Sequence, residues 1–125
     1  MKIILTATDE SLLSAWRTHC SDLPNVELHF GSILETEVDA AVSPANSFGF
    51  MDGGIDAVYA AAFPGMQERV RDYTKTLPLR ELLVGEAAIF DTNREIQWLI
   101  VAPTMRVPMV LENSINPYLA AKAAL

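Results

Sequence analysis

Residues 38–57 read VDAAVSPANSFGFMDGGIDA, and this stretch decides the fold. Its first five residues, 38–42, are compact and apolar enough to predict a buried strand. Ser43-Pro44 ends that strand, because proline has no N–H for the ladder and biases the preceding residue toward an extended shape. A polar, glycine-rich loop follows, and a helical pattern begins at Asp56. The stretch therefore predicts a strand, a loop and a helix, in that order.

Strands and helices are predicted to alternate along the whole chain. The strands are expected at residues 2–7, 26–30, 38–42, 87–90 and 96–102. The helices are expected after Thr8 or Asp9, over residues 56–63, from Met66 onward and over residues 116–125. Pro64-Gly65 leaves open whether the middle helical pattern is one kinked helix or two short helices. This alternation predicts an α/β fold with a mostly parallel sheet, which binds ligands beyond the carboxyl ends of its strands.

Composition limits the classes of function. The chain has 125 residues, half of them hydrophobic, which predicts one folded domain spanning residues 1–125. The formal net charge is −7 and the nine basic residues are scattered, so we expect no binding to duplex nucleic acid. A small anion remains compatible with this charge, because the free amides of a helix N-terminus attract phosphate locally.

The single cysteine, Cys20, excludes an internal disulfide and a thiolate metal cage. Neither His19 nor His29 has a cysteine or carboxylate at metal-ligand spacing, so we expect no metal site and no cofactor. From this cysteine usage, and because no charged-then-apolar leader opens the chain, we expect a cytoplasmic location. We expect no contact with a membrane, because no apolar stretch approaches the roughly 20 residues of a bilayer span.

The loop after residue 42 carries the residues suited to binding. Gly53 and Gly54 lack Cβ atoms, so their backbone can approach a ligand closely, and the following helix directs N–H groups and its positive dipole end outward. That arrangement suits a phosphate or a diphosphate. Asn46 offers an acceptor and two donors, which match the hydroxyls of a ribose. Asp56 can accept a hydroxyl proton or orient a water.

Each of these residues also has a plain structural interpretation. Taken alone, Asn46 after a proline is turn chemistry, Asp56 is a helix cap or a partner of the helix dipole, and paired glycines serve any tight turn. The apolar residues of the loop leave two interpretations open. Phe48, Phe50 and Met51 form a lid over a sugar or adenine, or they pack the loop onto the domain.

Together these elements resemble the signature of the macro domain family, in which a V-D-A-x-V strand leads to an A-N-S turn and a G-G-[VI]-D helix entry. Residues 85–87 and 100–103 resemble two later elements of the same family. The resemblance implies a three-layer α/β/α fold with a mixed, mostly parallel sheet. It also implies that the partner is ADP-ribose or an ADP-ribosylated protein.

The resemblance further implies roles for individual residues. Asn46 would contact the distal ribose, the backbone of Gly53, Gly54 and Ile55 would cradle the diphosphate, and Asn46 and Asp56 would be catalytic in hydrolysis of ADP-ribosyl linkages or of ADP-ribose 1″-phosphate. The complete ligand-binding set implied is Ser32, Ile33, Ala45, Asn46, Ser47, Gly53, Gly54, Ile55 and Asp56. The alternative function is a non-catalytic interaction or assembly domain with a degenerate pocket.

The sequence departs from the family pattern at three places. Ser32 stands where many members carry an aspartate that reads adenine, and Ala60 stands where hydrolytic members often carry a histidine. The family's last two strands, and the second glycine-rich loop between them, have no counterpart after residues 116–125. In the family those strands lie between the strands that match residues 26–30 and 38–42. We therefore expect a C-terminally incomplete sheet that is completed in a homo-oligomer or by a further chain.

Overall fold

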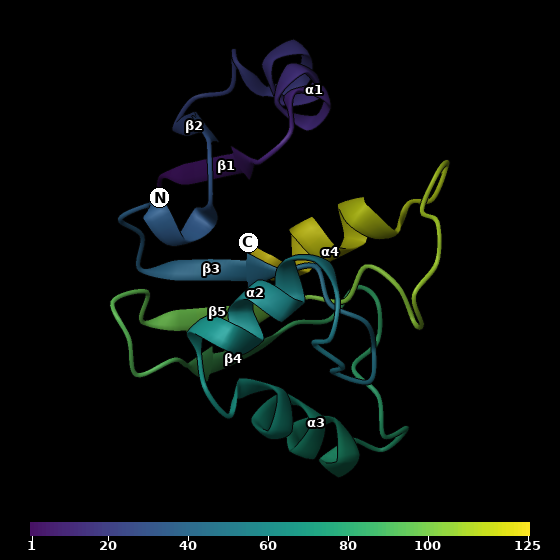
Figure 1. Cartoon of the computed structure of the whole chain (residues 1–125). Helices are drawn as coiled ribbons and strands as arrows, with labels where there is room; N and C mark the ends of the chain where they lie inside the picture. Colours follow the sequence, from purple (N-terminus) through teal and green to yellow (C-terminus); the bar gives the residue numbers. More distant parts are fainter. The chain divides into compact units, whose positions relative to one another are not determined.

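The computed structural model describes all 125 residues, which group into two compact units, Met1–Glu37 and Val38–Leu125 (Figure 1). Each unit has its own sheet, of two strands in the first and three in the second. Every helix falls short of the length and apolar character that a membrane span needs. The expectation of a single domain over residues 1–125 stays a prediction.

The first unit is a strand, helix, strand arrangement. β1 (Ile3–Ala7) pairs in parallel with β2 (Val26–Phe30), and α1 (Glu10–Cys20) connects them. Asp9 begins the helix, since its carboxylate accepts a hydrogen bond from the Leu12 N–H at 2.9 Å. These elements confirm the predicted ones.

The second unit contains a mixed three-stranded sheet in the order β3-β5-β4 (Figure 1). β3 (Ala40–Ser43) runs parallel to β5 (Trp98–Val101), and β4 (Ala88–Asp91) pairs with β5 in the antiparallel direction. The helices of this unit are α2 (Gly54–Ala62), α3 (Met66–Thr76) and α4 (Asn116–Ala124). The mixed, α/β character predicted from the sequence is confirmed.

The core of the second unit forms around β5 and the inner faces of α2 and α3. Leu99 and Val101 of β5 are fully buried, as are Tyr59 of α2 and Val70 of α3. Burying an aliphatic side chain such as that of Leu99 or Val101 stabilises the fold by roughly 1.5–3 kcal/mol. The Tyr59 ring stacks on Phe63 with 5.9 Å between centroids, which fixes the end of α2.

Two details differ from the sequence expectations or resolve them. β3 begins at Ala40 and includes Ser43, whose carbonyl still accepts a ladder hydrogen bond from the Ala102 N–H. The strand therefore ends at Ser43, immediately before Pro44, and not at Val42. The middle helical pattern is two helices, because Gly65 adopts a left-handed conformation, φ 80°, that separates α2 from α3.

Each sheet ends in a strand with one unpaired edge. β2 pairs only with β1, and β3 pairs only with β5. The carbonyls of Asp39 and Ser43 accept hydrogen bonds from the β5 side. Because bonding alternates by residue in a parallel ladder, the backbone groups of Ala40 and Val42 face the other edge. The Tyr59 hydroxyl donates to the Val42 carbonyl at 3.1 Å and satisfies one of them.

Candidate functional site

The loop after β3 is held against the segment that follows β5. The Ala45 carbonyl accepts from the Thr104 N–H at 3.0 Å, and the Ser47 N–H donates to the Met105 carbonyl at 3.0 Å. The Thr104 hydroxyl donates to the Pro44 carbonyl at 3.1 Å. The loop thus continues the parallel ladder beyond the carboxyl ends of both strands, where α/β sheets bind ligands. The sequence did not single out Thr104, although it directly follows the predicted strand and Pro103.

Asn46 uses most of its side chain to shape this loop. Its Oδ1 accepts from the backbone N–H groups of Phe48 and Phe50 at 3.1 and 3.3 Å, and its Nδ2 donates to the Phe50 carbonyl at 2.7 Å. The residue is buried, with 9% of its surface exposed. The turn interpretation of Asn46 is therefore confirmed, and a single N–H of the amide is left for any ligand.

Gly53 and Gly54 form an open stretch of backbone at the start of α2. Gly53 is the residue before the helix and Gly54, at φ 55°, is its first residue. A Cβ added at either position would meet no atom within 4 Å. No side chain accepts a hydrogen bond from the N–H groups of the first turn of α2. An anion approaching here meets free donors and the positive end of the helix dipole.

Asp56 lies in the third position of α2 and turns its carboxylate toward β3. The Ser43 hydroxyl donates to Asp56 Oδ1 at 2.5 Å. Asp56 is 7% exposed, and burial raises its pKa, while the hydrogen bond from Ser43 lowers the pKa in part. It does not cap α2, so the plain helix-cap interpretation of Asp56 is wrong. Burial and the charge of Asp56 raise the pKa of the Tyr59 phenol as well.

The buried charge of Asp56 predicts a pH-dependent stability difference for Asp56→Asn. In the folded state the pKa of Asp56 lies above its ordinary value of 3.8, so the protonated carboxyl stabilises the fold. This stabilisation is complete below the ordinary pKa and is lost as the pH rises through the folded pKa. Asparagine keeps an acceptor for Ser43 without a charge to bury. We expect Asp56→Asn to unfold at a higher temperature than the wild type at about pH 8, and the difference between the two melting temperatures should shrink toward about pH 4. A difference that is independent of pH would contradict this account.

The three apolar residues of the loop differ in how far they are buried. Met51 is buried in the core, and its N–H donates to the Gln67 side chain at 2.7 Å. The Arg106 guanidinium lies 5.2 Å from the centroid of Phe48, and Arg71 lies 4.3 Å from that of Phe50. Met51 therefore packs onto the unit, whereas Phe50 is 43% exposed with an arginine against its ring, and a lid role for Phe48 and Phe50 stays a prediction.

Ser32 and Ile33 belong to the first unit, where Ser32 has a structural role. It caps the short 3-10 helix Ile33–Glu35, since its hydroxyl accepts from the Leu34 N–H and its own N–H donates to Glu35, both at 3.2 Å. The sequence pattern did not indicate this helix. A ligand-binding role for Ser32 and Ile33 stays a prediction.

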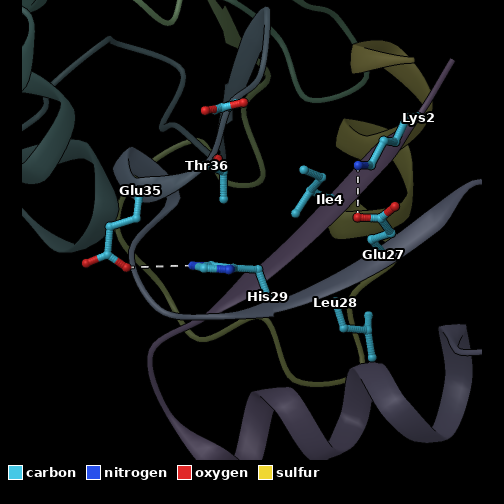
Figure 2. Close-up of a pocket in the computed structure, with 8 residues that line it drawn as sticks. Lys2, Ile4, Glu27, Leu28, His29, Glu35 and Thr36 are labelled. Carbon is cyan, nitrogen blue, oxygen red and sulfur yellow. Dashed lines mark ion pairs between the residues drawn. The ribbon is translucent and has the colours of Figure 1, made fainter.

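A cavity of about 350 Å³ lies in the same unit, lined by residues at β1, along β2 and over 35–37 (Figure 2). The Lys2 ammonium lies 2.9 Å from the Glu27 carboxylate at one side of it, and His29 points toward Glu35 at the other. None of the residues expected to bind ligand lines this cavity.

Comparison with known proteins identifies the fold. No family model matches the sequence. An uncharacterized protein of Aquifex aeolicus (strain VF5) is 33% identical over 96 residues, covering 76% of this chain and 55% of that protein. The macrodomain of Thermus aquaticus DarG matches the structure with a TM-score of 0.63 at 19% identity, over 74% of this chain. The chain has the macrodomain fold.

Other solved macrodomains agree. That of Mycobacterium tuberculosis DarG has a TM-score of 0.59 at 22% identity, and the Oceanobacillus iheyensis macrodomain solved with ADP has 0.59 at 20% identity. Each match covers 74% of this chain. The chain spans 60% of the two DarG macrodomains and 50% of the Oceanobacillus macrodomain. The macrodomain fold predicted from residues 38–57 is confirmed.

Proposed function

We propose that this macrodomain binds ADP-ribose through the loop between β3 and α2. The observation that carries the proposal is the uncapped start of α2, where Gly53 and Gly54 leave open space above free backbone donors. A mutant of the Oceanobacillus iheyensis macrodomain was solved with ADPR, and the Oceanobacillus macrodomain was solved with ADP. A diphosphate is the group that these donors suit best.

In this proposal the two halves of the ligand meet different parts of the loop. The backbone of Gly53, Gly54 and Ile55 binds the diphosphate, and the remaining N–H of Asn46 donates to a hydroxyl of the distal ribose. Ala45 and Ser47 contribute by holding the loop to the segment after β5, because their backbone groups are already paired there. An ADP-ribosylated protein would present the same chemical groups.

Hydrolysis of an ADP-ribosyl linkage, or of ADP-ribose 1″-phosphate, is the catalytic form of this proposal. Asp56 is its candidate base, since burial raises the pKa of a carboxyl toward the range in which it can accept a proton effectively. The competing function is a non-catalytic assembly module, which the unpaired edges of β2 and β3 favour. A cytoplasmic location stays a prediction.

Isothermal titration calorimetry with ADP-ribose tests the binding proposal. We expect a micromolar Kd for ADP-ribose, a weaker one for ADP, which lacks the distal ribose, and no heat with ribose 5-phosphate. Absence of heat at millimolar ADP-ribose, from a protein that melts cooperatively, would reject binding and favour the assembly module.

Asn46→Ala is expected to weaken ADP-ribose binding by about 1–3 kcal/mol, because the ribose loses a donor and the loop loses its internal hydrogen bonds. Calorimetry measures the change. Asn46→Asp is the matched variant, since it keeps the acceptors for Phe48 and Phe50 but removes the amide donor. An unchanged Kd in both variants would remove Asn46 from the site.

We further propose that the unpaired edges of β2 and β3 pair with strands supplied by another copy or by a further chain. β2 and β3 are edge strands, and the unpaired N–H and C=O groups of an edge strand are a template for pairing with another chain. We expect light scattering on this 125-residue chain to give at least twice the mass of one copy. A cooperatively melting monomer would contradict the proposal.

A further inference from the structure

Ser43 and Asp56 form a buried pair at the base of the loop. Ser43 is the last residue of β3 and has no exposed surface, and Asp56 is 7% exposed. The distance from the Ser43 hydroxyl to Asp56 Oδ1 is 2.5 Å, which is typical of a strong hydrogen bond to a charged oxygen. The bond ties the end of the strand to the first turn of α2.

The two oxygens of the Asp56 carboxylate are in different situations. Oδ1 receives the hydrogen bond from Ser43, and no other group of the chain donates to the carboxylate. The fully buried side-chain nitrogen and oxygen atoms without a hydrogen-bond partner are those of Trp16 and His29. Oδ2 has no partner and is not one of these atoms, so part of its surface is open to solvent. Oδ2 is therefore an acceptor that is neither used by the chain nor sealed from solvent.

The other polar group in this region does not compete for the carboxylate. The Tyr59 hydroxyl donates to the Val42 carbonyl, so it is satisfied elsewhere. Tyr59 still senses the charge of Asp56, which raises the pKa of its phenol in addition to the effect of burial. Ser43 is thus the only side chain that hydrogen-bonds to Asp56.

We propose that Ser43 is a positioning residue for Asp56, whose Oδ1 it holds so that Oδ2 stays free as the acceptor for a ligand hydroxyl or a water. This role rests on the proposed function, because it assigns the free oxygen to the ADP-ribose site. The bond favours the ionised carboxylate, since a hydroxyl donates to a charged oxygen more strongly than to a neutral carboxyl. It also fixes the rotamer of Asp56, since one oxygen is anchored to the strand.

The test is an NMR titration of the Asp56 carboxyl carbon, combined with calorimetry, in Ser43→Ala. We expect the pKa of Asp56 to rise further in this variant, because the one hydrogen bond that lowers it is lost. Affinity for ADP-ribose at neutral pH, or turnover where it occurs, should fall roughly tenfold. Ser43→Thr, which keeps the hydroxyl, should restore both values.

Tyr59→Phe is the matched control, because it removes a buried hydroxyl that does not bond to Asp56. An unchanged Asp56 pKa in Ser43→Ala would overturn the proposal, even where stability falls. If that variant does not fold, Ser43→Cys, with its weak S–H donor, replaces it. A wild type that binds no ADP-ribose would overturn the proposed function and with it the role toward ligand. The titration would still decide separately whether Ser43 controls Asp56.

Discussion

Gly54→Val and Gly53→Val are expected to abolish ADP-ribose binding, with a loss of at least about 100-fold in affinity. A Cβ at either position points into space that no atom of the chain occupies within 4 Å, which is where the diphosphate is proposed to lie. A branched side chain would fill that space and cover the free N–H groups of α2. Calorimetry measures the loss, and circular dichroism reports whether the fold persists.

The two glycine variants differ in how they affect stability. Gly53 has an extended conformation, φ −148°, that valine adopts readily, whereas Gly54 has a left-handed one, φ 55°. Gly54→Val should therefore also cost roughly 1–2 kcal/mol of stability. Gly65→Val is the matched control, since Gly65 is left-handed, precedes α3 and also has open space around it. Normal binding by Gly53→Val, or loss of binding by Gly65→Val, would contradict the assignment of the phosphate to this loop.

Asp56→Ala is expected to lower kcat by about 10²–10⁴-fold while changing KM little, if the wild type hydrolyses ADP-ribosyl linkages. A base acts mainly in the transition state, so its removal lowers the rate more than the affinity. Release of ADP-ribose from a modified protein, followed over time, measures the rate.

Asp52→Ala is the control for this experiment. Asp52 is an exposed carboxylate just before Gly53, so it shares the charge of Asp56 but not its burial. Its removal should leave kcat within about a factor of two. Equal losses of rate and affinity in Asp56→Ala would instead make Asp56 a structural residue that supports the loop.

The order of elements could be predicted from the sequence because it depends on local chemistry. Asp9 begins a helix through its own side chain, and Gly65 separates two helices through its own backbone conformation. The macrodomain fold could be predicted because spaced motifs in residues 38–57 agree in order with a known signature. In each case the deciding residues are close in sequence.

The chemistry inside the site was harder to predict, because it depends on contacts between distant segments. Asn46 has its side chain occupied by the loop backbone, which its residue type alone does not reveal. Thr104 reaches Pro44 across 60 residues, so no local pattern indicates it. The sequence indicates Ser43 only as the end of a strand, whereas its hydroxyl donates to Asp56 in the fold. Residue types indicate the candidates, and the packing of α2 on β3 decides what each one does.

The most direct test of the central claim is NMR mapping of backbone amide shifts during titration with ADP-ribose. If the loop between β3 and α2 binds the diphosphate, the largest shifts should occur at Gly53, Gly54, Ile55 and Asp56, and they should saturate with the Kd found by calorimetry. Amides around the cavity near Lys2 should then shift least. Saturable shifts confined to that cavity, or no shifts at millimolar ADP-ribose, would contradict the account.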